Sequence, residues 1–208
     1  MKTNKFIVIE GIDGCGKTTV INKLKNELND QFVFVKDPSG TALADFVSDW
    51  IHDPTNIDKA QSDIGLYLLM ASRVDMINNL IKPALRDGKT VICDRFLLST
   101  FVYQWSNKNQ DLFKILDSKV NDLVSIDSLI FLDIDPKIAK ERRCKRITND
   151  DSFDKLSISY FDELRNRYKQ FITASEYHAV GSNNYIIDAS KSIDEVYTNI
   201  KNLILKNE

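Results

Sequence analysis

Cysteine is scarce in this chain of 208 residues, and long apolar runs are missing from it. The three cysteines, Cys15, Cys93 and Cys144, form no CxxC pair, so we expect neither a disulfide framework nor a structural zinc site. The early apolar run Phe6–Ile9 stops at Glu10, and no later segment reaches the length of a membrane span. The sequence therefore predicts reduced thiols, no membrane partner and a cytoplasmic location.

An excess of one charge sign is also missing. The chain has 28 basic and 30 acidic residues, which gives a formal net charge of −2. This balance produces no global field toward nucleic acid or an anionic membrane, so any bound anion must be held locally. Hydrophobic residues make up 43% of the chain and charged residues 28%, which is typical of a globular α/β domain. We expect one domain over residues 1–208 and no nucleic-acid partner.

Glycine is rare, yet three of the seven glycines lie together within the segment G-I-D-G-C-G-K-T. This is a complete Walker A motif, which follows an apolar strand pattern and precedes a helical one. In such a loop, backbone amides turn toward phosphate oxygens, Lys17 reaches the β and γ phosphates, and Thr18 binds Mg²⁺. A glycine-rich structural turn, the alternative, requires neither side chain. The predicted ATP-binding residues are Gly11, Ile12, Asp13, Gly14, Cys15, Gly16, Lys17, Thr18 and Thr19.

Apolar strand patterns alternate with helical patterns along the chain. The expected strands are 5–10, 32–36, 90–94, 128–134 and 184–188. This alternation predicts a P-loop NTPase fold, an α/β architecture of three layers (α/β/α) around a five-stranded parallel sheet. The longest helix is expected over 57–86, with a bend at Pro83, and an amphipathic helix is expected over 155–177. Ligands should gather at the carboxyl ends of the strands.

A GTPase switch is a different class of phosphate-loop protein, and two segments resemble its motifs. Residues 37–40 read D-P-S-G, like a DxxG element, but they lie nearer to the phosphate loop than that class places them. Asn107 and Lys108 resemble the start of NKxD, but Gln110 stands where that motif needs an acid. A kinase for small acceptors is favoured. It requires a second anion site, a carboxylate linked to Mg²⁺ and cations over the transferred phosphoryl group.

Two further positions fit those requirements. Asp94 and Arg95 end an apolar strand pattern, where the carboxylate can hold Mg²⁺ or its water shell and the guanidinium can bind phosphate. A surface ion pair is the alternative there. Arg73 is a lone cation after an apolar helix centre, and its burial would require a partner. An acceptor phosphate and an interhelical salt bridge are both open as that partner.

The densest basic cluster comes near the third quarter of the chain. Between Lys137 and Arg146 six of ten residues are basic, and Arg142 and Arg146 lie one helical turn apart. The cluster could clamp a triphosphate. A solvated helix face and a nucleic-acid patch remain open, although no aromatic residue is interleaved for stacking. The polar segment that follows predicts a short lid over about 143–154.

Several sequence blocks carry a family resemblance over nearly the whole chain. They are FIVIEGIDGCGKTT, DPSGT at 37–41, ASR at 71–73, IKPAL at 81–85, CDRFLLSTFVYQ at 93–104, FLDIDP at 131–136 and FDELRNRY at 161–168. Together they resemble the thymidylate kinase family of nucleoside monophosphate kinases. The resemblance implies Mg²⁺-dependent phosphoryl transfer from ATP to dTMP, which yields dTDP and ADP for nucleotide biosynthesis. It also implies a homodimer, for which the apolar helix near residues 66–70 is the expected seam.

The resemblance also implies roles for individual residues. Asp13 would contact the 3′-hydroxyl of the acceptor sugar, and Tyr103 would fill the space of a ribose 2′-hydroxyl. The implied acceptor site comprises Asp13, Asp37, Leu69, Arg73, Arg95, Ser99, Thr100, Tyr103 and Gln104. In the family that this sequence resembles, an assisting arginine lies either in the phosphate loop or in the lid. The loop here carries none, so the lid arginines are the candidates. The predicted catalytic residues are Lys17, Arg95, Arg142, Arg143 and Arg146, and the predicted Mg²⁺ ligands are Thr18 and Asp94.

The chain departs from the family pattern at a few positions. Leu69 replaces a phenylalanine that stacks on the thymine ring, Lys36 and Asp37 replace Arg-Glu, Ser39 replaces a glycine, and Ser152 replaces a lid arginine. A kinase of relaxed specificity, acting on dUMP or other deoxynucleoside monophosphates, is therefore the alternative function. A P-loop switch or binding module without kinase activity is a second alternative.

Overall fold

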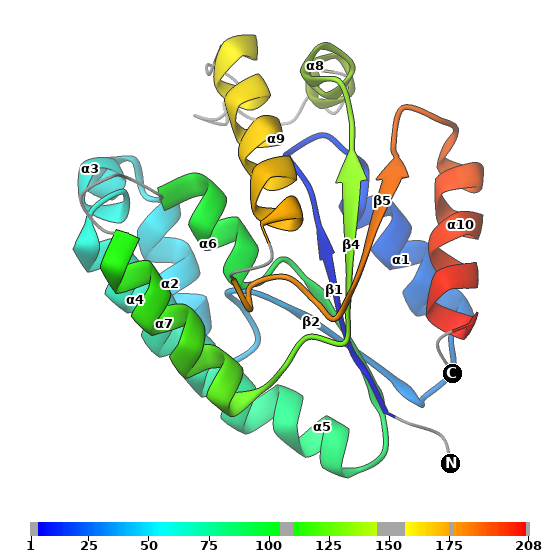
Figure 1. Cartoon of the computed structure of the whole chain (residues 1–208), viewed down its shortest axis with the longest axis horizontal. Coiled ribbons are helices and arrows are strands. Elements are labelled where there is room, and N and C mark those ends of the chain that lie inside the picture. Colours follow the sequence, from blue (N-terminus) through cyan, green and yellow to red (C-terminus); the bar gives the residue numbers. More distant parts are fainter. Residues whose placement is uncertain (1–3, 105–109, 145–156, 175–176, 207–208) are drawn as a thin grey trace.

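A five-stranded, all-parallel sheet forms the centre of the molecule in a computed structural model, with the strand order β2-β3-β1-β4-β5 (Figure 1). The structure describes residues 4–104, 110–144, 157–174 and 177–206. The strands are β1 (Phe6–Glu10), β2 (Phe32–Lys36), β3 (Thr90–Asp94), β4 (Ser128–Asp133) and β5 (Asn183–Asp188). All five predicted strands are confirmed, and so is the predicted parallel α/β architecture.

Helices cover both faces of this sheet (Figure 1). They are α1 (Lys17–Glu27), α2 (Ala42–His52), α3 (Ile57–Ala60), α4 (Asp63–Met76), α5 (Lys82–Arg86), α6 (Leu97–Gln104), α7 (Gln110–Leu123), α8 (Pro136–Cys144), α9 (Ile158–Thr173) and α10 (Ile193–Lys206), with a 3₁₀ turn η1 (Pro54–Asn56) and a π-helical segment η2 (Ile77–Ile81). Helices α1 and α10 pack together on one face, while α4, α6, α7 and α9 lie on the other (Figure 1). No helix in the described ranges is long and apolar enough to cross a membrane.

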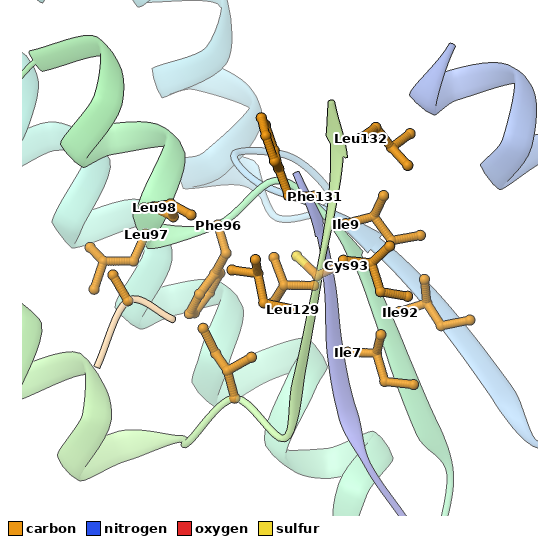
Figure 2. Close-up of a cluster of buried hydrophobic side chains, with 14 of the residues drawn as sticks. Ile7, Ile9, Ile92, Cys93, Phe96, Leu97, Leu98, Leu129, Phe131 and Leu132 are labelled. Atoms are coloured by element: carbon orange, nitrogen blue, oxygen red, sulfur yellow. The ribbon is translucent and has the colours of Figure 1, made fainter. Parts of the chain in front are cut away.

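The core lies on both faces of the central strands. All five residues of β1 are buried, and successive side chains point to opposite faces. Figure 2 shows Ile7 and Ile9 on one side of the sheet and Phe96 and Leu129 on the other. Burial of each such side chain stabilises the fold by about 1.5–3 kcal/mol. Continuous burial along β1 therefore fixes the strand that leads into the phosphate loop.

The helix expected over 57–86 is divided in the structure, so this prediction was wrong in part. A short α3 ends at Ala60, and the Ser62 side chain caps a new helix by accepting a hydrogen bond from the Ile64 amide at 3.2 Å. Before Pro83 the chain widens into the π-helical segment η2. Proline lacks an N–H group and its ring crowds the preceding turn, and a π turn accommodates both effects without ending the helix.

The amphipathic helix expected over 155–177 is shorter than predicted. In α9 the Ser157 side chain accepts a hydrogen bond from the Tyr160 amide at 3.1 Å, and Ala174 is already extended beyond the last helical residue. Serine is a favoured N-cap residue because its hydroxyl oxygen accepts a hydrogen bond from an amide in the first turn. The apolar periodicity alone could not locate this helix boundary. The lid expected over about 143–154 falls outside the described residues, apart from Arg143 and Cys144.

Candidate active site

The phosphate loop connects β1 to α1 and depends on glycine. Gly14 and Gly16 have φ angles of 90° and 93°, which side-chain-bearing residues rarely adopt. A Cβ atom on Gly14 would also lie 2.4 Å from the carbonyl oxygen of Ala139 in α8. Gly16 is the N-cap of α1 and offers no side chain there, so the first amides of the helix remain available to an anion.

The loop lysine lies beside the carboxylate that ends β3. Lys17 is buried, and its Nζ atom lies 3.7 Å from Oδ1 of Asp94, which has no hydrogen-bond partner among the described residues. Thr18 is exposed at the start of α1. A carboxylate oxygen and a hydroxyl oxygen are ligands that suit Mg²⁺, which is usually bound through one or two protein groups plus substrate phosphates. The described residues form no cluster of three or more His, Cys, Asp or Glu side chains that could hold a metal unaided.

A cavity of about 400 Å³ opens beside the phosphate loop. All nine residues predicted for the acceptor site line it: Asp13, Asp37, Leu69, Arg73, Arg95, Ser99, Thr100, Tyr103 and Gln104. They come from the phosphate loop, the segment after β2, α4, the segment after β3, and α6. The topology therefore brings these distant residues to one place, at the carboxyl ends of the strands.

Arg73 makes a buried ion pair at the wall of this cavity. Its side chain bonds to Asp37 Oδ2 through Nε at 2.6 Å and to Thr100 Oγ1 through Nη2 at 2.8 Å, and its guanidinium lies 5.3 Å from the Phe96 ring centroid. Burial raises the pKa of Asp37, although Arg73 opposes this. Asp37 Oδ1 is buried and has no hydrogen-bond partner within the described ranges. The guanidinium thus has a protein partner from the segment after β2, and both residues face the cavity.

Arg95 joins the phosphate loop to the cavity. Its φ angle is 66°, a strained conformation for a residue other than glycine. Its Nη2 donates to Asp13 Oδ1 at 2.5 Å, and its guanidinium lies 5.4 Å from the Tyr103 ring centroid. Burial raises the pKa of Asp13, but the positive charges of Arg95 and Lys17 outweigh it and hold that pKa below its usual range. Asp13 is therefore an ionised carboxylate at neutral pH, placed between the loop and the cavity.

Residues that the sequence analysis did not select also belong to this region. Glu10, at the end of β1, is completely buried and accepts hydrogen bonds from Ser99 and Tyr168 side chains. Phe96 and Tyr160 line the cavity. Nothing in the apolar pattern distinguishes Phe96 from a core residue or Tyr160 from a helix-surface residue. Glu10 carried a signal, because an acid directly after four apolar strand residues is unusual for a buried strand.

The predicted lid arginines are separated in space. Arg143 lines the cavity, its Nη1 donates to the Asp13 carbonyl at 2.6 Å, and its guanidinium lies 3.9 Å from the Phe161 ring centroid. Arg142 points elsewhere and donates through Nη1 to the Ala189 carbonyl at 2.8 Å, in the segment between β5 and α10. Arg146 and Ser152 lie outside the described residues.

Comparison with known proteins now decides the family. A family model described as thymidylate kinase matches residues 9–200. The chain belongs to the thymidylate kinase family. It is 34% identical over 198 residues to the thymidylate kinase of Francisella tularensis subsp. novicida (strain U112), which covers 93% of this chain and 91% of that protein. It is also 34% identical over 207 residues to the thymidylate kinase of Blochmanniella pennsylvanica (strain BPEN), which covers 95% of this chain and 93% of that protein.

Membership of the thymidylate kinase family makes the chain an enzyme, a nucleoside monophosphate kinase that binds ATP. This confirms the resemblance seen in the sequence and the choice of a kinase over a GTPase switch. The positions that depart from the thymidylate kinase pattern and that the structure describes lie at the cavity or in the segment that precedes α2. Leu69 and Lys36 line it, and the Ser39 hydroxyl donates to Asp45 Oδ1 at 2.8 Å near the start of α2.

Proposed function

We propose that this enzyme transfers the γ-phosphoryl group of ATP to dTMP in a Mg²⁺-dependent reaction that yields dTDP and ADP. The observation that carries the proposal is the cavity of about 400 Å³ directly beside the phosphate loop. Asp13 of the loop lines this cavity and is bonded to Arg95, which also lines it. An acceptor in this cavity would have its phosphate next to the γ-phosphate. The names of the relatives support dTMP as the acceptor.

The chemistry requires positioning and charge neutralisation rather than a covalent intermediate. Lys17 and the open amides at the start of α1 would hold the β and γ phosphates. Arg95 and Arg143, which approach Asp13 from different elements, would neutralise charge on the transferred group. Thr18 and Asp94 would hold Mg²⁺, which supplies further neutralisation of the phosphate oxygens. Of the two proposed lid arginines within the described ranges, Arg143 lines the cavity and Arg142 does not.

The acceptor end of the cavity suits a deoxynucleoside monophosphate. Arg73 and Arg95 give it two cations, which suit a phosphate rather than a neutral sugar. Tyr103 donates from its hydroxyl to Asp13 Oδ2 at 3.4 Å, and its ring occupies space beside the proposed sugar site. A ribose 2′-hydroxyl would need that space. Leu69 provides an apolar wall without an aromatic ring, which supports the alternative of a relaxed specificity toward dUMP or other deoxynucleotides.

A coupled ADP-release assay with ATP and Mg²⁺ tests the function. The acceptors are dTMP, dUMP, dCMP, dGMP, dAMP, ribothymidine monophosphate and thymidine. Turnover confined to dTMP and dUMP is expected, and Lys17→Ala should abolish it while leaving the fold intact. Comparable turnover with purine deoxynucleotides would establish the relaxed kinase. No turnover above the Lys17→Ala background would contradict the proposal.

Leu69→Phe tests whether residue 69 faces the base of the acceptor. A stacking ring at this position should stabilise the bound base by about 0.5–1.5 kcal/mol, or roughly twofold to twelvefold in KM. The KM for dTMP should fall, with an unchanged KM for ATP. An unchanged KM for dTMP in this variant would show that residue 69 does not face the base.

We also propose that the enzyme is a homodimer through the exposed sides of α2 and α4. Four exposed residues at heptad spacing, Ile64, Tyr67, Ala71 and Val74, form a stripe along α4. On the adjoining α2, Leu43 and Phe46 are exposed in the same way. The seam expected at residues 66–70 is therefore shifted, because Leu66, Leu69 and Met70 face the interior of their own chain. A second copy would cover this apolar surface.

A further inference from the structure

Glu10 is the most completely enclosed acid near the active site. It ends β1 with 0% of its surface exposed, and its carboxylate accepts four hydrogen bonds. Oε1 accepts from the backbone amides of Phe96 at 2.9 Å and Ser99 at 3.2 Å. Oε2 accepts from the Ser99 hydroxyl at 2.6 Å and the Tyr168 hydroxyl at 3.0 Å. No lysine or arginine in the described part of the chain donates to it directly.

Burying a carboxylate in this way is energetically unfavourable if the group serves only to hold the fold together. Burial of a carboxylate without a directly bonded cation costs several kcal/mol before hydrogen bonds offset it. A neutral Ser, Thr or Asn side chain could cap the start of α6 at a lower cost. Burial raises the pKa of Glu10, while the charge of Arg95, the hydrogen bonds from Ser99 and Phe96, and the charge of Lys17 oppose this shift and favour the carboxylate. The presence of an acid here therefore requires another explanation, and the nearest candidate is the guanidinium of Arg95.

Two hydroxyl groups connect Glu10 to Arg95. Nη1 of Arg95 donates to the Ser99 hydroxyl oxygen at 3.1 Å and to the Tyr168 hydroxyl oxygen at 3.3 Å. Each hydroxyl has one proton, and a carboxylate only accepts. The two hydroxyl oxygens also lie 2.9 Å apart, so one can donate to the other. In each of these arrangements both hydroxyl protons are donated to Glu10, either directly or through the other hydroxyl. The lone pairs of the hydroxyl oxygens are then left to accept hydrogen bonds from the guanidinium of Arg95.

The backbone next to Arg95 depends on the same carboxylate. Arg95 has a φ angle of 66°, which costs of order 1–3 kcal/mol and persists only where neighbouring structure holds it. The Phe96 amide, the next one along the chain, donates to Glu10 Oε1. One side chain thus holds both the turn that carries Arg95 and the two hydroxyls that receive its guanidinium.

We propose that Glu10 is a positioning residue for Arg95, whose carboxylate orients the Ser99 and Tyr168 hydroxyls so that they hold the guanidinium toward the acceptor phosphate. This inference rests on the proposed function, in which Arg95 binds that phosphate. Glu10 itself does not touch the substrate. Its effect should therefore appear in acceptor binding and disappear when the Arg95 guanidinium is removed.

Glu10→Gln is a sharp test because glutamine has nearly the same shape as glutamate but replaces one acceptor oxygen with a hydrogen-bond donor. The amide oxygen can replace Oε1 toward the two backbone amides, which leaves the NH₂ group facing the two hydroxyls. Their oxygens must then accept from Gln, and their protons turn toward the N–H groups of Arg95. The reverse amide orientation would instead set the NH₂ group against two backbone N–H groups. Both orientations disturb the contact with Arg95.

The experiment is a double-mutant cycle of Glu10→Gln and Arg95→Lys, read by calorimetric titration with dTMP alone and by steady-state kinetics. Glu10→Gln should weaken dTMP binding and kcat/KM by about tenfold or more, since hydrogen bonds to charged groups are worth about 1.5–3 kcal/mol. The KM for ATP should change less than about twofold. In the Arg95→Lys background the same substitution should cost less than about threefold, because the partners act together.

Matched variants control the cycle. Glu27→Gln removes one carboxylate from an exposed ion pair with Lys201, in a helix that does not line the cavity, and should leave all constants unchanged. Tyr168→Phe keeps the ring that stacks on Phe131 at 4.9 Å but removes one bridging hydroxyl. It should raise the dTMP dissociation constant in the same direction as Glu10→Gln, by a smaller factor. Tyr168→Phe also serves as the reporting variant if Glu10→Gln does not fold.

Three results would overturn the inference. The first is unchanged dTMP binding in folded Glu10→Gln or, if that variant does not fold, in Tyr168→Phe. The second is an equal loss with and without the Arg95 guanidinium, and the third is an equal loss for ATP and dTMP; either of these would indicate a structural role only. Failure of the proposed function is distinguishable, because wild-type protein that binds dTMP without turnover would refute the reaction while the binding cycle still decides the role of Glu10.

Discussion

At the scale of single residues, the cavity beside the phosphate loop contains cations whose charge is balanced by carboxylates of the protein. Arg73 is 1% exposed and shares Asp37 Oδ2 between two of its nitrogens, while Arg95 meets Asp13. Removing one member of a buried pair leaves the other charge without compensation, which costs about 3–5 kcal/mol. The same residues are therefore expected to contribute to stability and to substrate binding, and the two contributions can be separated.

Arg73→Ala should lower the free energy of unfolding by about 3–5 kcal/mol and raise the KM for dTMP, because Asp37 is left buried without its cation. The double variant Arg73→Met with Asp37→Leu removes both charges. It should recover most of the stability, yet dTMP binding should stay weak. Urea unfolding and steady-state kinetics measure the two effects. Normal stability and a normal dTMP KM in Arg73→Ala would refute both roles.

A second residue-scale prediction concerns pH. Burial raises the pKa of Asp133, but hydrogen bonds from Arg165 and Lys169 outweigh it and hold that pKa below its usual value. The stabilisation is therefore fully present above the unfolded pKa of about 3.9 and is lost as pH falls through the lowered folded pKa. Asp133→Asn should destabilise the enzyme by about 1–3 kcal/mol at pH 7, with a difference from wild type that shrinks toward pH 3.

The control for this prediction is Asp122→Asn, which removes an exposed partner of Lys119 at 3.9 Å and should change little at either pH. Urea midpoints at a series of pH values measure both variants. A deficit in Asp133→Asn that stays constant from pH 7 to pH 3 would contradict the assignment.

At the scale of elements, the conformation of the phosphate loop depends on how closely its backbone approaches a neighbouring helix. The carbonyl of Ala139 in α8 fills the space where Gly14 would carry a Cβ atom. Helix α8 also carries Arg143, whose guanidinium bonds to the Asp13 carbonyl. The position of α8 therefore decides both the shape of the phosphate loop and the approach of a cation to the cavity.

Gly14→Ala should abolish ATP binding, because its Cβ atom would meet Ala139 at 2.4 Å in a backbone with a φ angle of 90°. Gly88→Ala is the matched control, since its φ angle of 76° is also positive but no atom lies within 4 Å of the added Cβ. That variant should lose about 1–2 kcal/mol of stability and no activity. Fluorescent-ATP titration and urea unfolding compare them. Equal ATP affinity in the two variants would show that contact with α8 is unimportant.

At the scale of the whole molecule, the apolar residues on the exposed sides of α2 and α4 form a surface that no other described segment covers. Phe46 is 58% exposed beside the stripe on α4, and such surfaces usually mark an interface. Phe46→Glu should convert the proposed dimer into monomers in light-scattering chromatography, since a carboxylate would be buried at the seam. Ile186→Glu, at a similarly exposed position on the edge strand β5, should remain dimeric. A monomeric wild type, or identical behaviour of both variants, would refute the interface.

The sequence alone determined the phosphate loop, the five strands and the family. Each of these depends on local chemistry: glycines at fixed spacing before Lys17 and Thr18, and uninterrupted apolar runs such as β3, which suit a strand covered on both faces. The residues proposed for the acceptor site were selected in the sequence through family resemblance, because the segments that contribute them are far apart in the chain. Strand order then places those segments at one edge of the sheet.

Only the tertiary structure decided how those residues are paired. The sequence left the partner of Arg73 open, and the fold supplied Asp37. The sequence analysis treated Arg142 and Arg143 alike. Adjacent side chains on a helix point about 100° apart, so Arg142 contacts the segment after β5 while Arg143 faces the cavity. Glu10 likewise acquired its significance only when α6 and α9 brought Ser99 and Tyr168 against it. The burial of a side chain and the direction of its hydrogen bonds depend on neighbours that are distant in sequence. A local sequence pattern does not specify those neighbours.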